Sequence, residues 1–211
     1  MQKNEFKIPL IRLLYAVISF FQLLTTTFLI KYLSEKYKKS NIGMGIVTFV
    51  NLFWFAFIII TIVFDWGNIN IIYLMIFRLW EIFIINIWLF IFRQGASKVE
   101  HTEKSENNLR LFILLLIQYF TMMLIFSLIN KAIFSLNNNS FMVNRLTTNN
   151  AITWIYYSVV TITTVGYGDI TPVSNIAKMS SISEILFGMF FVLLFITNII
   201  GELKFIWNEN K

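Results

Sequence analysis

Thr163-Thr164-Val165-Gly166-Tyr167-Gly168-Asp169 is the stretch around which the rest of the chain is organised. Gly166 and Gly168 lack a Cβ atom and adopt positive φ angles at little cost, so successive peptide planes can turn their carbonyl groups to the same side. A row of carbonyl oxygens that faces one way can replace the water molecules around a cation. The two glycines therefore permit such a row of oxygens in this stretch.

Two other interpretations of these glycines are weaker. A dinucleotide-binding loop of the form G-x-G-x-x-G is excluded, because Thr171 stands at its sixth position. An ordinary turn would explain two glycines beside a tyrosine. It would not explain the short amphipathic helix expected before the stretch or the long apolar helix expected after it.

The composition is that of a membrane protein. Of the 211 residues, 57% are hydrophobic and only 13% are charged, whereas soluble domains carry about 25% charged residues. The apolar residues are gathered into blocks of the length that a membrane-spanning helix needs, about 20 residues. We expect no cleaved signal peptide, because the first block is too long for one and no small-residue cleavage site follows it.

Charge and reactive residues exclude several classes of function. The net charge of +6 comes mostly from lysines between apolar blocks, which membrane topology explains better than nucleic-acid binding does. The absence of cysteine excludes disulfides and thiolate metal sites. The only histidine, His101, lies in a polar linker. With no nucleophile or metal motif, we do not expect an enzyme.

Five apolar blocks are long enough to cross a bilayer, and a sixth helix is too short. The expected crossings are residues 8–33, 42–64, 71–92, 109–134 and 176–207. The short helix, 151–162, has Asn150 as its N-cap and runs straight into the stretch 163–169. Non-helical backbone at membrane depth must be surrounded by protein or water, so this segment is expected to be re-entrant.

The blocks predict three parts. Residues 1–93 form a three-helix N-terminal membrane domain, and 94–108 form a linker on the cytoplasmic side. Residues 109–211 form the pore domain, in which an outer helix, a pore helix, the 163–169 stretch and an inner helix follow one another.

With these flanks, the stretch resembles the selectivity filter of potassium channels. The chain resembles the small bacterial members of the tetrameric cation-channel (pore-loop) family, specifically over residues 156–169 and more loosely through the last helix. The resemblance implies an all-α integral membrane protein with five transmembrane helices and one re-entrant pore helix. One pore loop supplies one wall of the filter, so four copies of the chain would assemble as a homotetramer.

The resemblance also implies the residues that bind permeant K⁺. Thr164, Val165, Gly166 and Tyr167 would contribute carbonyls, the Thr164 hydroxyl would complete the inner site, and the Gly168 carbonyl would face the outer mouth. The expected function is passive, K⁺-selective conduction. Two alternatives stay open: a nonselective cation channel, and a regulatory membrane subunit with a silent pore.

Three residues are expected to support the filter. Asp169 lies at its outer end, where a carboxylate can concentrate cations or brace the filter. Tyr156 and Tyr157 occupy places where much of the family has tryptophans that hydrogen-bond the outer aspartate and the filter tyrosine. Each tyrosine keeps an aromatic ring with a polar tip. The alternative is that both tyrosines only pack in an apolar core.

Gating candidates lie on the last helix. Gly188 matches the place of the family's glycine hinge, although it could equally serve close packing, and Glu184 precedes it by one turn. Val192, Phe195 and Ile199 recur at helical spacing. They could form an apolar constriction that gates by dewetting, or they could face lipid.

The third block contains one pair of opposite charges, Arg78 and Glu81, on one helical face. Voltage-gated relatives need about three to four gating charges per subunit. A single arginine beside a glutamate therefore predicts little voltage dependence. The pair is expected to be structural, or else a remnant of a sensor.

Counting crossings predicts the orientation. If the pore loop enters from outside, the linker 94–108 and the lysine cluster of residues 31–39 lie in the cytoplasm, as the positive-inside rule favours. The N-terminus, with Lys3 and Lys7, then lies outside if residues 8–33 cross the membrane; the alternative is that this first block lies along the membrane surface. We expect a multi-pass protein of the cell membrane, in a bacterial plasma membrane because the heavy use of isoleucine, lysine, asparagine and phenylalanine is typical of an AT-rich bacterium. The expected partners are copies of the chain, lipid and an unidentified regulatory protein, but no nucleic acid.

Overall fold

Helices dominate the part of the chain that the structure, a computed structural model, describes: residues 40–65, 69–92, 101–143 and 150–209. Its elements are α3 (Ser40–Val63), α4 (Ile69–Phe92), α5 (His101–Leu136), the 3₁₀ helix η2 (Asn138–Ser140), β1 (Phe141–Val143), α6 (Ala151–Ile162), β2 (Ile170–Pro172) and α7 (Asn175–Glu209). The predicted crossing at 8–33 and the lysine cluster at 31–39 lie outside the described residues.

The chain divides into two compact units. Met1–Val50 and Trp80–Ser97 form one, and Asn51–Leu79 and Lys98–Lys211 form the other. The division runs through α3 and α4, whereas the sequence placed both helices in one domain at 1–93. The second unit contains all the residues predicted for the filter and its support.

Three of the described helices are long and apolar enough to cross a membrane. Their spans are Asn70–Ile87 in α4, Phe112–Leu136 in α5 and Asn175–Ile200 in α7. The apolar stretches of α3 (Thr48–Val63) and α6 are shorter. The described residues thus provide candidate crossings for three of the five predicted blocks, while the block 42–64 contains the shorter apolar stretch of α3. The short α6 has the length expected of a re-entrant helix.

The predicted cytoplasmic linker is partly helical. The sequence predicted a polar linker at 94–108, and α5 begins within it, at His101, and runs for 36 residues. The segment from His101 to Asn108 contains no glycine or proline, and its glutamates and lysine are good helix formers. The outer helix therefore extends beyond the apolar block on which the prediction was based.

A small antiparallel sheet corrects the expectation of an all-α chain. Phe141 pairs with Pro172, Met142 with Thr171 and Val143 with Ile170. The N–H of Val173 donates to the carbonyl of Ser140 at 2.8 Å. Since hydrogen-bonded and non-bonded pairs alternate in an antiparallel ladder, Pro172 falls at a non-bonded pair, where its missing N–H does no harm.

Side-chain caps set the start of both helices that flank the predicted filter, residues 163–169 (the filter stretch). Asn150, the predicted N-cap of α6, accepts a hydrogen bond from the N–H of Thr153 at 3.0 Å. The Ser174 hydroxyl accepts from the N–H of Ala177 at the start of α7 at 3.2 Å. Each cap satisfies a backbone donor that the helix cannot satisfy itself, so α6 begins where the sequence predicted.

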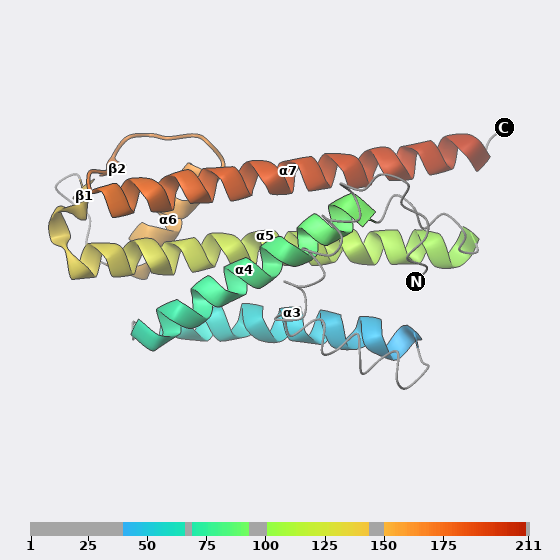
Figure 1. The fold of residues 1–211 in the computed structure, drawn as a ribbon, viewed down its shortest axis with the longest axis horizontal. Coiled ribbons are helices and arrows are strands. Elements are labelled where there is room, and N and C mark those ends of the chain that lie inside the picture. Colours follow the sequence, from blue (N-terminus) through green and yellow to red (C-terminus); the bar gives the residue numbers. More distant parts are fainter. Residues whose placement is uncertain (1–39, 66–68, 93–100, 144–149, 210–211) are drawn as a thin grey trace, which may run out of the picture. The chain divides into compact units, whose positions relative to one another are not determined.

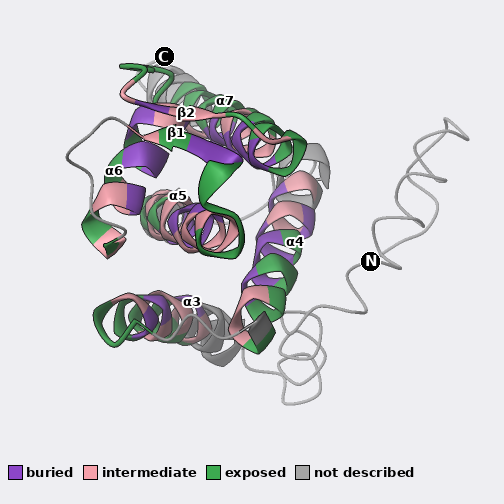
Figure 2. Ribbon diagram, turned by 90° about the vertical axis from the view of Figure 1, so that its left-hand side faces the viewer, coloured by how far each residue is buried: buried purple, intermediate pink, exposed green. Residues whose placement is uncertain are grey.

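Helices α5, α6 and α7 pack together, with α5 and α7 side by side and α6 near the end that carries the two strands (Figure 1). An apolar cluster joins α6, α7 and both strands. Its buried members are Phe141, Trp154, Tyr157, Ile170 and Ala177. Figure 2 shows buried residues on α6 and on both strands. The cluster fixes the two ends of the filter stretch, because α6 precedes the stretch and β2 follows it.

Candidate functional site

The filter stretch has an alternating backbone. Thr164 and Gly166 both have φ of +58°, and Gly168 has φ of +79°. Left-handed residues therefore alternate with ordinary ones. Such alternation gathers successive N–H groups on one side of the chain and leaves the carbonyls to face the other. The glycines adopt the positive φ angles that the sequence predicted for them.

The positive φ angle of Thr164 is a feature that the sequence alone did not reveal. A β-branched residue at positive φ is a backbone outlier, and such strain costs about 1–3 kcal/mol and tends to occur at functional sites. The surrounding hydrogen bonds hold it in place. Its N–H donates to the carbonyl of Thr161 at 3.0 Å, on the last turn of α6.

The first half of the filter stretch is fastened to the end of α6. The N–H groups of Val165 and Gly166 both donate to the carbonyl of Val160, at 3.0 and 3.3 Å. Because these N–H groups point toward α6, the alternating backbone is expected to point the carbonyls of the same segment away from α6. Residues 163–168 are all exposed in the single chain.

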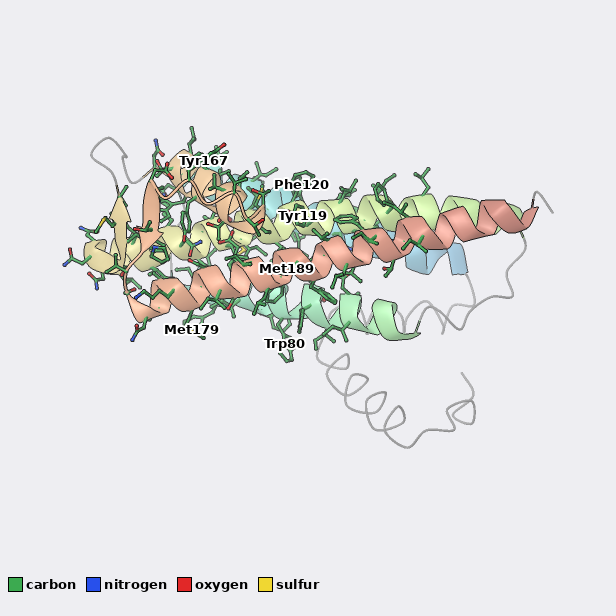
Figure 3. The ribbon with its side chains drawn as sticks, turned by 90° about the horizontal axis from the view of Figure 1, so that it is seen from above. Trp80, Tyr119, Phe120, Tyr167, Met179 and Met189 are labelled. Atoms are coloured by element: carbon green, nitrogen blue, oxygen red, sulfur yellow. The ribbon has the colours of Figure 1, made fainter. Side chains whose placement is uncertain are left out.

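Tyr156 contacts the far end of the stretch, and its role in supporting a filter stays a prediction. Its ring stacks on that of Tyr167, with the centroids 6.4 Å apart and the planes 9° from parallel. Its hydroxyl hydrogen-bonds the Asp169 carboxylate, and this bond raises the pKa of the Tyr156 phenol. Figure 3 shows Tyr167 on the loop between α6 and β2.

Tyr157 lies elsewhere. Its hydroxyl is 2.7 Å from that of Ser181 on α7, and its ring packs edge-on against Phe141 and Trp154 in the apolar cluster. In the single chain this hydroxyl therefore joins α6 to α7, and the expected bond to the filter stays a prediction. Neighbouring residues lie about 100° apart around a helix, so Tyr156 and Tyr157 face different partners.

Gly188 makes close packing possible between α7 and the end of α6. A Cβ atom built on Gly188 would lie 2.6 Å from Cγ1 of Ile162 and 3.0 Å from its carbonyl oxygen. Ile162 is the last residue of α6, directly before the filter stretch. Of the two interpretations of this glycine, the geometry supports close packing, and the hinge stays a prediction.

Glu184 is fully buried one turn before Gly188. Its Oε2 accepts a hydrogen bond from Nδ2 of Asn130 on α5 at 3.1 Å, and the Ser180 hydroxyl donates to the other side of that asparagine at 2.7 Å. The sequence singled out Glu184 but not Asn130, because a polar residue in an apolar block does not reveal which helix it faces.

The three residues predicted to form a constriction do not share a surface. Val192 and Ile199 are exposed, but Phe195 packs on α5, with ring centroids 5.7 Å from Phe112 and 6.0 Å from Tyr119 (Figure 3 labels Tyr119). A separate apolar stripe runs along α7 at alternating spacings of four and three residues. Its exposed members are Ile182, Leu186, Met189, Leu193, Ile196 and Ile200.

Arg78 is buried in a polar cluster that includes the outer helix of the pore. Its guanidinium donates to Oδ1 of Asn51 at 2.7 Å and lies 5.4 Å from the ring centre of Trp54. Gln118 on α5 donates to the same Asn51 oxygen at 3.2 Å. Glu81 is also fully buried, one turn further along α4. The sequence did not identify Asn51 or Gln118 as part of this cluster.

Comparison with known proteins finds two similarities. Residues 112–204, which include α6, the filter stretch and most of α7, match an ion-channel family. The chain is also 35% identical over 75 residues to two-pore potassium channel 3 of Arabidopsis thaliana. The match covers 36% of this chain, and the chain spans only 17% of that relative's length. No solved structure matches the chain. The matched family is one of ion channels and not of enzymes.

Proposed function

We propose that the chain is the subunit of a homotetrameric, K⁺-selective channel. The alternating positive φ angles at residues 164, 166 and 168 carry the proposal. Four such segments around an axis would offer K⁺ the carbonyls of Thr164 to Gly168 in place of its hydration water, with the Thr164 hydroxyl at the inner end. The likeness of residues 112–204 to ion channels supports it.

Exposed apolar surface supports assembly. One chain supplies one filter strand, which is too little to surround an ion. The stripe from Ile182 to Ile200 on α7 and the ring of Tyr167 are exposed in the single chain. Contiguous exposed apolar surface marks an interaction site. Copies of the chain would cover part of it, and the remainder would line the inner pore or meet lipid.

One helix end and one carboxylate would favour cations on the conduction path. α6 ends at Ile162, beside the start of the filter. The partial negative charge at a helix C-terminus, repeated in four subunits, would attract a cation waiting below the filter. At the opposite end, Asp169 would raise the local cation concentration.

The proposed channel also implies an orientation of the chain in the membrane and a set of candidate gating residues. The filter's outer end at Asp169 would face outside and the end of α7 the cytoplasm, in a cell membrane that we take to be a bacterial plasma membrane, with the N-terminus outside. Arg78 is the only basic residue in the described span of α4, so we propose little intrinsic voltage sensing. Gly188, Glu184 and the exposed residues of α7 are the gating candidates, and a regulatory protein could act through the N-terminal helices.

Ion flux from liposomes tests the proposal. The purified protein should carry K⁺ far faster than Na⁺ and should be blocked by barium. Gly166→Ala should abolish this selectivity, because an L-alanine at φ of +58° is strained by about 1–2 kcal/mol in each subunit. Leu136→Ala, at an exposed position at the end of α5, is the matched control and should behave as the wild type.

Two outcomes would replace the proposal with its alternatives. Equal fluxes of Na⁺ and K⁺ would identify a nonselective cation channel. An intact tetramer without flux would identify a regulatory subunit with a silent pore.

A further inference from the structure

One oxygen atom joins three helices of the chain. Oδ1 of Asn51 on α3 accepts a hydrogen bond from the Arg78 guanidinium on α4 at 2.7 Å and another from Nε2 of Gln118 on α5 at 3.2 Å. All three side chains are buried. The segment Asn51–Leu79 belongs to the same compact unit as α5, α6 and α7. These three residues, the Asn51 junction, therefore connect α3 and α4 with the outer helix of the pore domain.

Arg78 lies in the middle of a candidate membrane span. That span of α4 is Asn70–Ile87, and Gln118 lies within the candidate span of α5, Phe112–Leu136. A charged side chain is costly at the centre of a bilayer, and there it almost always faces the interior of a helix bundle. The guanidinium carbon also lies 5.4 Å from the ring centre of Trp54 on α3, a distance at which an aromatic ring attracts a cation. If α4 separated from α3 and α5, this charge would be exposed to lipid.

A second polar link between these helices is weaker. Lys131 on α5 forms an ion pair with Asp65, which lies just after α3, and the Asp65 side chain is mostly exposed. Exposed ion pairs contribute little to stability because water and salt screen them. The Asn51 junction is buried, so it should provide more of the polar attachment of α3 and α4 to α5 than this ion pair does.

We propose that Arg78 is a positioning residue that holds α3 and α4 against the outer pore helix α5, with the Asn51 oxygen as the shared acceptor. The attachment itself does not depend on the proposed channel function, but its consequence does. α5 packs on α6 and α7, which flank the filter stretch. A displacement of α3 or α4 would therefore reach the pore through Gln118, and the junction is the route by which these helices regulate conduction.

Substitutions at the junction separate this attachment from simple packing. Gln118→Leu removes the donor on α5 and leaves the bond between Asn51 and Arg78 in place. Asn51→Leu removes the shared acceptor, whereas Asn51→Asp keeps the acceptor atom and adds a charge that strengthens the bond to the guanidinium. Thr121→Val is the matched control on α5: the Thr121 hydroxyl is also buried, but it donates to the carbonyl of Ile117 on its own helix at 2.6 Å.

The first readout is the distance between α3 and α5, measured in the full chain in lipid vesicles. The chain contains no cysteine, so spin labels can be attached at Leu52→Cys and Leu109→Cys, two exposed positions on these helices. Pulsed electron paramagnetic resonance then gives the distance distribution. Labelled chains are diluted with unlabelled ones, so that the measured pairs lie within one chain.

The wild type, Asn51→Asp and Thr121→Val should give one narrow distribution. In Gln118→Leu the fraction of longer distances should rise about threefold, as the average loss of one hydrogen bond between membrane helices predicts. Asn51→Leu should exceed this change, because it also removes an acceptor from a buried charge. Wild-type distances in both leucine variants would overturn the proposal. A distribution in Thr121→Val as wide as theirs would overturn it too, since the loss of any buried polar group would then be enough.

The second readout is the rate of K⁺ flux from the same vesicles. Gln118→Leu should change the flux rate about threefold, and Thr121→Val should leave it at the wild-type value. Longer distances in Gln118→Leu with an unchanged flux would overturn the regulatory role of the junction. A wild-type protein that gives the narrow distribution but conducts no K⁺ would refute only the proposed channel function.

Discussion

Adding one methyl group at Gly188 tests whether the inner helix sets the position of the filter. The Cβ of Gly188→Ala would meet Cγ1 of Ile162 at 2.6 Å and its carbonyl oxygen at 3.0 Å. Neither atom can yield easily. Cγ1 is the inner part of a side chain that is only 4% exposed, and the oxygen belongs to the last residue of α6.

Two opposing terms determine the expected magnitude. Alanine is favoured over glycine in a helix interior by about 1 kcal/mol. Overpacking a well-packed core costs about 1–3 kcal/mol. The net destabilisation should be roughly 1 kcal/mol per subunit. Helix propensity alone predicts that Gly188→Ala stabilises the protein, so the sign of the measured change in unfolding free energy distinguishes the two terms. Since the clash displaces Ile162, K⁺ selectivity or the stability of the conducting filter should fall as well.

A double-mutant cycle with thermal unfolding and K⁺ flux as readouts isolates this contact. Ile162→Ala removes Cγ1 and should relieve part of the clash, so the double variant should be less destabilised than the sum of the single variants by about 0.5–3 kcal/mol. Ile162→Val keeps a γ carbon on the side chain and is the matched control. Additive effects, or a Gly188→Ala channel more stable than the wild type with unchanged selectivity, would refute the reasoning.

Three further predictions concern the outer end of the filter and the surface. Tyr156→Phe keeps the ring stack but loses the bond to Asp169, so filter inactivation should speed up in flux recordings without a change in melting temperature. Met142→Pro should remove a ladder hydrogen bond of β1, which costs about 1–3 kcal/mol in unfolding experiments and should loosen the outer filter. Asp65→Asn breaks an ion pair with Lys131 in which the Asp65 side chain is 71% exposed, so unfolding should change by less than about 1 kcal/mol; a larger change would contradict it.

The features that the sequence predicted well depend on short-range interactions along the chain. The bounds of α6 followed from a capping asparagine and from the start of the glycine-bearing stretch, and both are short-range signals. The positive φ of Gly166 and Gly168 followed from their lack of a Cβ atom. The helical extent of α5 was underestimated, because the prediction equated the helix with its apolar block.

Features that depend on contacts between distant segments were not predicted. β1 is three residues long and pairs with β2, directly after the filter stretch. A strand this short has no long alternation of apolar and polar residues from which it could be predicted. The rotation of Tyr157 toward Ser181 and of Phe195 toward α5 depends on how α7 docks. Helical spacing shows which residues share a face, but not what that face meets.

The glycines of the pore domain show why residue type alone does not reveal a role. At Gly166 and Gly168 a Cβ would meet nothing within 4 Å in the single chain, and only the left-handed backbone requires glycine. At Gly188 the backbone is helical and only space requires it. Thr164 adopts the same φ as Gly166 without being glycine. If only the backbone conformation mattered, glycine would serve at this position too, so we propose that the threonine hydroxyl has a role of its own there, as an inner K⁺ site would require.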